Sequence, residues 1–181
     1  THYVKPMNSR RLLTLLGLTL LLGSCTSTVA LYKAYLGDPL QDMQLARVEG
    51  ANFRRSEYIN NYVDTVRFMM VDEIPVSNSA NYAAIQIAPG FHQLKVYFSW
   101  DLGNQRGLAP AMVDYARTRE NISRTLRFNA RAGEHYIVRA EPTFAAPKHN
   151  ITTLSHVDFW VEDQAGNEIV SREEGRYISV Q

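Results

Sequence analysis

The sequence predicts an all-β protein, namely a small antiparallel β-sandwich of about eight strands. The chain has 181 residues, of which 45% are hydrophobic, and this is the composition of one globular domain. Its ten tyrosines favour strands. Many short segments alternate apolar and polar residues, which is typical of a strand with one buried face. No helical stretch is long enough to serve as the crossover of a βαβ unit. Together these observations favour one sandwich domain over an α/β fold.

Residues 1–24 have the pattern of a cleaved signal peptide, and we expect the natural chain to start at Met7. A short basic region containing Arg10 and Arg11 follows that methionine. Residues 12–23 then include eight leucines and no charge. A membrane-crossing helix needs about 20 apolar residues, so this run fits a signal peptide better than a permanent span.

The chain has one cysteine, Cys25, which follows Leu22, Gly23 and Ser24 at the end of this run. A disulfide within the chain is excluded because there is no second cysteine. The order of leucine, two small residues and cysteine resembles the lipobox of bacterial lipoprotein signal peptides. The resemblance implies that the sulfur of Cys25 receives a diacylglyceryl group, that the chain is cut before this residue, and that its new amino group is acylated.

Acylation of Cys25 would anchor the protein to a lipid bilayer, since two or more acyl chains give stable attachment. In the proteobacterial sorting pattern, aspartate after the cysteine retains a lipoprotein at the inner membrane. Thr26 stands there instead, so the resemblance implies the periplasmic side of the outer membrane. The alternative is cleavage after Ala30, because Thr28, Val29 and Ala30 loosely match the small-x-small site of the general signal peptidase.

Residues 25–43 are expected to form the lipidated cysteine, a tether and an entry loop, because Gly37, Asp38 and Pro39 interrupt regular structure. The β-sandwich is expected over residues 44–172, with a C-terminal tail over 173–181. Alternation predicts eight strands in this domain. They are Gln44 to Val48, Thr65 to Val71, Tyr82 to Ile87, His92 to Trp100, Asn121 to Ala130, His135 to Glu141, His156 to Glu162 and Asn167 to Arg172.

Turn residues predict how some of these strands connect. Ala88-Pro89-Gly90-Phe91 suits a type II turn, and we expect it to join strands 82–87 and 92–100 as a pair. The segment "VEDQAGNEIV" predicts a terminal hairpin with its tip at Asp163 to Gly166. The long connection before Asn121 is compatible with either a short helix or an irregular strand over residues 109–120.

Two segments repeat the order strand, glycine, any residue, histidine, strand: "IAPGFHQLKV" and "NARAGEHYIV". This order resembles the strand-turn-strand unit of small envelope β-domains such as PEGA modules. A wider set of positions resembles uncharacterised proteobacterial lipoproteins. In many of those proteins the aspartate that ends the second strand is followed by glycine. Here Glu73 follows Asp72, so we expect that turn to differ. The set is Tyr35, Gly37, Leu40, Ala46, Phe68 to Asp72, Pro89, Gly90, His92, Gly133, His135, Tyr136, Phe159 and Trp160.

The histidines of these two segments, His92 and His135, are the candidate metal ligands, because stacking of the two turns would bring both imidazoles together. A histidine at the first strand position after a turn more often packs its ring and hydrogen-bonds a turn carbonyl. The sequence supplies no third ligand at metal spacing. We therefore predict no metal and no cofactor.

Charge and motifs exclude several functions. The net charge is +1 for the whole chain, and removal of residues 1–24, with three basic and no acidic residues, leaves −2. Nucleic-acid binding is disfavoured, because it needs a cationic face. The sequence contains no nucleophile elbow, no His-Glu-x-x-His pair and no phosphate-binding glycine loop. We expect a protein that is not an enzyme.

The expected function is that of a lipid-anchored accessory module that binds an envelope protein or peptidoglycan in the periplasm. Its candidate contacts are aromatic residues expected at the surface, Tyr97, Tyr115 and Trp160. The alternative is a soluble or anchored periplasmic metal-binding protein or hydrolase that uses the turns bearing His92 and His135.

Overall fold

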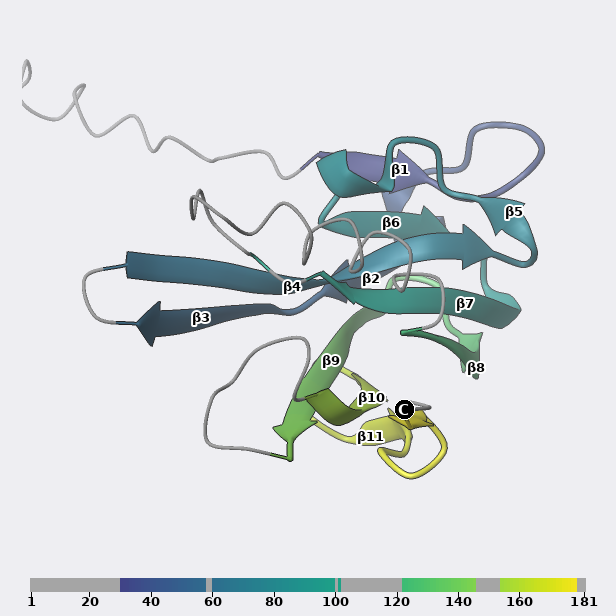
Figure 1. Cartoon of the computed structure of the whole chain (residues 1–181). Coiled ribbons are helices and arrows are strands. Elements are labelled where there is room, and N and C mark those ends of the chain that lie inside the picture. The colour runs from purple at the N-terminus through teal and green to yellow at the C-terminus, as the bar shows by residue number, and fades with distance from the viewer. Residues whose placement is uncertain (1–29, 58–59, 100, 102–121, 146–153, 179–181) are drawn as a thin grey trace, which may run out of the picture.

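Two β-sheets packed face to face form the protein, which confirms the predicted all-β sandwich (Figure 1). The computed structural model describes residues 30–57, 60–99, 101, 122–145 and 154–178. Within these residues the regular elements are strands and two short 3-10 helices, Asp42–Gln44 (η1) and Ser79–Asn81 (η2).

The first sheet has seven strands in the described residues, in the order β1-β6-β2-β9-β10-β11, with β12 also on the edge of β10. Most of its pairings are antiparallel, but β1 with β6 and β2 with β9 are parallel. Its strands are β1 (Leu31–Lys33), β2 (Ala46–Gly50), β6 (Ala84–Ile87), β9 (His135–Phe144), β10 (Leu154–Glu162), β11 (Glu168–Val170) and β12 (Arg176–Ile178).

The second sheet has five strands in the described residues, in the order β3-β4-β7-β8, with β5 on the edge of β4. All of its pairings are antiparallel. In Figure 1 the β3–β4 hairpin extends beyond the rest of the sandwich. The strands are β3 (Asn52–Glu57), β4 (Asn60–Val71), β5 (Ile74–Pro75), β7 (Gly90–Ser99) and β8 (Ser123–Ala130).

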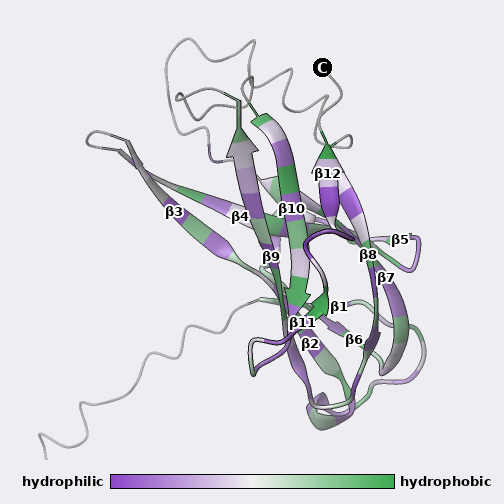
Figure 2. Cartoon of the chain, turned by 90° about the horizontal axis from the view of Figure 1, so that it is seen from below, coloured by the Kyte–Doolittle hydropathy of each residue, from purple (hydrophilic) through white to green (hydrophobic). Residues whose placement is uncertain are grey.

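The core lies between the two sheets and is built from the apolar positions of the alternating strands. Along β7, His92, Leu94, Val96 and Phe98 are buried. Apolar and polar bands alternate along β10 in Figure 2, as expected of a strand with one buried face. The largest fully buried side chains are Phe68, Phe159, Ile85, Ile87, Leu94, Leu126, Val48, Val66, Val96, Val138, Val157 and Val161.

The domain is longer at both ends than the sequence predicted. Residues 31–33, assigned to the tether, form β1, and Tyr32 and Ala34 pack against the core. Residues 176–178, assigned to the C-terminal tail, form β12. The boundaries 44 and 172 are therefore wrong, because three-residue strands at a sheet edge are too short to show a clear alternation.

An ion pair fixes β12 on β10. Arg176 donates two hydrogen bonds to the Asp158 carboxylate, at 2.6 and 2.9 Å, and the two residues are register partners. Only 14% of the Asp158 side chain is exposed. The hydrogen bonds from Arg176 outweigh burial and hold the pKa of Asp158 below its ordinary value of 3.8.

This pair should make the attachment of β12 depend on pH. A depressed folded-state pKa gives stability that is fully present above the ordinary value and is lost as pH falls through the folded value. Because Arg176 is half-exposed, solvent screening reduces the coupling energy, which we expect to be favourable at pH 7. A double-mutant cycle of Asp158→Asn and Arg176→Gln, measured by urea unfolding, should give this favourable coupling at pH 7 and a value near zero well below pH 3.8. Equal coupling at both pH values would contradict the assignment.

Among the described strands the chain passes between the sheets at four places, from β2 to β3, from β5 to β6, from β6 to β7 and from β8 to β9, and the last two of these are the repeated glycine-histidine segments. β6 leads from the first sheet into β7 of the second, and β8 leads back into β9. Gly90 and Gly133 have φ values of +132° and +74°, so each turn does use the positive φ that glycine permits. The predicted pairing of strands 82–87 and 92–100 is wrong, because these strands lie in different sheets.

The crossing from β2 into β3 consists of a single residue, Ala51. The Ala51 amide donates to the Val138 carbonyl of the first sheet, and the Ala51 carbonyl accepts from the Val66 amide of the second. A Cβ built on Gly50 would lie 2.1 Å from the Val66 carbonyl oxygen. The absence of a side chain at Gly50 therefore allows the two backbones to approach.

The predicted terminal hairpin is confirmed as β10 and β11, with Val161 opposite Val170. At its tip the Asp163 carboxylate accepts hydrogen bonds from the amides of Ala165 and Asn167 and from the Asn167 side chain. These hydrogen bonds hold the pKa of Asp163 below its ordinary value, and the bond from the Asn167 side chain has the largest effect.

The remaining predicted strands match observed ones with shifted ends, and β3 and β5 were not predicted. The last four residues of β3, in the segment "NFRRSE", are all polar or charged, so this strand lacks the alternation that marks a half-buried strand. The choice between helix and strand for residues 109–120 lies outside the described residues.

Candidate functional site

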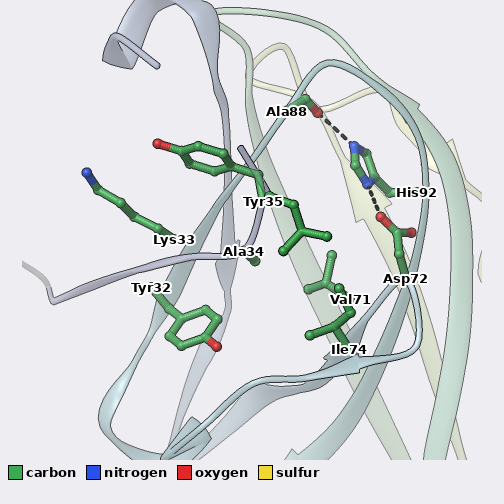
Figure 3. Close-up of a pocket in the computed structure, with 10 residues that line it drawn as sticks. Tyr32, Lys33, Ala34, Tyr35, Val71, Asp72, Ile74, Ala88 and His92 are labelled. Carbon is green, nitrogen blue, oxygen red and sulfur yellow. Dashed lines mark hydrogen bonds and ion pairs between the residues drawn. The ribbon is translucent and has the colours of Figure 1, made fainter. Parts of the chain in front are cut away.

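A pocket of about 460 Å³ opens at one end of the sandwich, between the N-terminal segment and the turn after β4 (Figure 3). This volume lies within the range of about 300–1,000 Å³ typical of small-molecule sites. The lining is mostly apolar, and two of its side chains, Leu36 and Ile74, are 83% and 48% exposed. The ten lining residues are Tyr32, Lys33, Ala34, Tyr35, Leu36, Val71, Asp72, Ile74, Ala88 and His92.

One wall of the pocket is a hydrogen-bonded unit of His92, Asp72 and Ala88, which we name the turn clamp (Figure 3). The His92 Nε2 lies 2.7 Å from the Ala88 carbonyl oxygen, and Nδ1 lies 2.7 Å from the Asp72 carboxylate. Each ring nitrogen therefore has a protein oxygen within hydrogen-bond distance. The clamp ties the crossing between β6 and β7 to the turn between β4 and β5.

The expected role of His92 as a packed residue bonded to a turn carbonyl matches this geometry. Its side chain is 10% exposed, and both nitrogens are engaged. Because each nitrogen already faces a protein oxygen, neither is directed at a metal ion or a substrate.

The turn that carries Asp72 is a two-residue hairpin connection with unusual residues. Asp72 and Glu73 have φ values of +48° and +67°, the left-handed pair that a type I′ turn requires. Glycine or asparagine usually occupies such positions. Asp72 is stabilised here because Oδ2 accepts from His92 and Oδ1 accepts from the Gln93 amide at 2.8 Å.

The opposite wall comes from residues 32–36. The Ala34 amide donates to the Gln86 carbonyl and so extends the pairing of β1 with β6. The Tyr32 ring packs edge-on against Tyr82, with centroids 5.2 Å apart. The Tyr35 hydroxyl oxygen accepts from the Leu40 amide at 3.3 Å, which closes the loop that follows β1. These contacts hold the segment over the pocket.

Lys33 supplies the uncompensated charge among the lining residues. The other acidic or basic side chains of the lining are Asp72 and His92, which are hydrogen-bonded to each other within the turn clamp. In Figure 3 the tips of the Lys33 and Tyr35 side chains point to the same side of the pocket, away from the turn clamp. The pocket therefore has a cationic side at Lys33, an apolar middle and a hydrogen-bonded side at the turn clamp.

The structure does not bring His135 to this pocket. His135 begins β9 in the first sheet, and its Nε2 lies 3.4 Å from Glu49. Glu49 also pairs with Arg47 at 3.1 Å. Since His92 is bonded to Asp72 and Ala88 in the second sheet, the two histidines have separate partners. Across the described residues there is no group of three histidine, cysteine or acidic side chains placed to hold a metal ion.

Two of the three aromatic residues expected at the surface are buried, so the expectation of exposure is wrong for them. Tyr97 is 3% exposed and lies within 3.5 Å of the Ser79 hydroxyl. Trp160 is 5% exposed, since Arg172 lies 3.8 Å above its ring and its indole N–H donates to Glu162 at 2.7 Å. Tyr115 lies outside the described residues.

The polar cluster around Trp160 stabilises the outer face of the first sheet. Burial alone would raise the pKa of Glu162, but hydrogen bonds from Trp160 and Arg139 outweigh it and hold that pKa below its ordinary value. Arg172 also pairs with Glu141 and Glu168. Ion pairs thus join the two arginines of this cluster to three carboxylates, which is typical of a structural network.

The predicted lipidation residue Cys25 and the cleavage residues Leu22, Gly23 and Ser24 lie outside the described residues. Within the part of the chain that the structure describes, no helix has the length and apolarity needed to cross a membrane. No family model matches the chain, and no curated protein or solved structure gives a significant match.

The pocket residues before Leu40 were missed from the sequence because they were assigned to a tether. The short run "LYKAYL" does place Leu31, Lys33 and Tyr35 on one face and Tyr32, Ala34 and Leu36 on the other. This alternation could have indicated an ordered segment. It could not have indicated the contact with β4, which depends on the tertiary fold.

Proposed function

We propose that the protein is a non-catalytic envelope lipoprotein, anchored by acylated Cys25 on the periplasmic side of the outer membrane, whose sandwich is a binding module. The observation that carries the anchor is the order of basic region, leucine run, Gly23, Ser24 and Cys25. Its candidate partners are an envelope protein or peptidoglycan.

The short distance along the chain from Cys25 to β1 supports an anchored module. β1 begins at Leu31, six residues after the cysteine. Six residues span at most about 20 Å, so an acylated Cys25 would hold the sandwich close to the bilayer. A pocket at one end of the domain would then remain near the membrane surface.

The alternative of a hydrolase or metal-binding protein gains no support from the histidines. His92 is engaged at both nitrogens by the turn clamp, and His135 belongs to the other sheet. A general base needs a free lone pair within reach of substrate. Binding without catalysis therefore accounts best for the pocket.

Replacement of Cys25 by alanine should abolish acylation and release the protein from membranes, because the thiol is the attachment point. The measurement is radiolabelled palmitate incorporation together with membrane fractionation. Ser27→Ala, two residues beyond the motif, is the matched control and should behave as wild type. A wild-type product that is soluble and begins at Leu31 would favour the general signal peptidase and contradict the anchor.

A further inference from the structure

We infer that the pocket binds a small aliphatic carboxylate, with the carboxylate at Lys33 and Tyr35 and the apolar tail against Val71 and Ile74. This inference rests on the binding-module part of the proposed function and names its ligand class. The pocket volume of about 460 Å³ suits one small molecule.

The charge of the lining determines the sign of the ligand. The turn clamp engages the one acidic side chain of the lining, Asp72, with the His92 ring, and the second oxygen of Asp72 accepts from the Gln93 amide. A cationic ligand would have to compete with both bonds. Lys33 adds a positive charge that an anion can meet.

The hydrogen-bonding groups determine where the anion lies. The Tyr35 oxygen accepts from the Leu40 amide, which leaves its O–H able to donate to a ligand. The ammonium of Lys33 is a second donor, and both side chains point to the same side of the pocket in Figure 3. A carboxylate between them would receive two hydrogen bonds, one of them charge-assisted.

The apolar lining determines the rest of the ligand. Val71 forms a buried surface, while Leu36 and Ile74 expose large apolar side chains at the pocket. Because the polar atoms of the turn clamp are satisfied, they offer little to the N–H and C=O groups of a peptide. A buried peptide group without partners is costly, so a simple hydrocarbon tail fits this lining better.

Calorimetric titration of the full-length protein in lipid nanodiscs tests the inference, with the heat from empty nanodiscs subtracted. The probes are octanoate, octylammonium with the same tail and opposite charge, and acetate with the same head and no tail. Octanoate should bind at least about tenfold more tightly than either comparison probe. Octylammonium lacks the charge-assisted hydrogen bond of the carboxylate, and acetate lacks the buried methylenes of the tail. Equal affinities for octanoate and octylammonium would overturn the inference.

Lys33→Glu should weaken octanoate binding at least about tenfold by reversing the charge at the head position. Lys95→Glu is the matched control, since Lys95 lies on β7 outside the pocket lining, and it should change the affinity less than about twofold. An unchanged affinity in a folded Lys33→Glu variant, verified by its melting temperature, would overturn the assignment. Wild-type protein that fractionates with membranes but does not bind octanoate contradicts the pocket alone, whereas soluble wild-type protein that binds octanoate contradicts the anchor alone.

Discussion

Gly50→Ala should destabilise the protein by about 4 kcal/mol or more, which is the range reached by substitutions that force backbone movement in a core. The added Cβ would lie 2.1 Å from the carbonyl oxygen and 3.0 Å from the carbonyl carbon of Val66. That peptide cannot simply retreat, because the Val66 amide donates to Ala51 at 3.0 Å. The Gly50 amide is itself bonded to the Ala83 carbonyl. Relief of the clash would therefore break the Val66–Ala51 bond at the crossing or the Gly50–Ala83 bond beside β6.

Gly166→Ala is the matched control for this substitution. A Cβ at Gly166 meets nothing within 4 Å, but the residue has a φ of +82°, so only the backbone preference opposes alanine. Its expected cost is about 1–2 kcal/mol. Urea unfolding followed by tryptophan fluorescence measures both variants. Similar losses for Gly50→Ala and Gly166→Ala would show that the sheets do not approach each other as closely as described.

His92→Ala should lower the free energy of unfolding by about 2–4 kcal/mol. The substitution removes two hydrogen bonds of 2.7 Å, one of them to a carboxylate, and leaves a space beside the core. It also leaves the Ala88 carbonyl without its hydrogen-bond partner and removes the ring that holds Asp72 at positive φ. The turns after β4 and β6 should then separate more easily.

The control for His92 is another histidine at a strand position. His156 lies on β10, and its ring has a weak contact of 3.4 Å with Ser155. His156→Ala should cost less than about 1 kcal/mol. Hydrogen exchange adds a local test, because the Gln93 amide, which donates to Asp72, should lose protection in His92→Ala. An unchanged exchange rate at Gln93 would contradict the clamp.

Strand positions could be predicted where burial leaves an alternating pattern. β7 and β8 follow the predicted segments closely, because each has one face in the core and one face toward solvent. β1 and β12 escaped prediction, since three residues at a sheet edge carry too little pattern. The parallel pairing of β2 with β9 joins residues far apart in the sequence, and no local signal specifies it.

The turn between β6 and β7 shows why pairing is harder to predict than position. Pro89 and Gly90 do predict a turn, and Gly90 has the positive φ that such a turn uses. Local turn chemistry does not specify whether the next strand stays in the same sheet. Here the chain crosses to the other sheet, and the crossing allows Ile85 of β6 and Leu94 of β7 to be buried between the two sheets.

The pocket could be predicted only in part. His92 was correctly expected to bond a turn carbonyl, because its place after a turn favours that contact. Its second partner, Asp72, lies 20 residues earlier, at the end of another strand. Lys33 and Tyr35 were assigned to a tether, so their place in the pocket wall depends on the docking of β1 onto β6.

The central claim is that Cys25 is acylated and begins the mature chain. Mass spectrometry of the N-terminal peptide, from protein extracted from bacterial membranes, tests it most directly. The claim predicts a peptide that begins at Cys25 and carries a diacylglyceryl group on sulfur and an acyl group on nitrogen. A peptide that begins at Leu31, or one that contains Cys25 as a free thiol after residues 22–24, would contradict it.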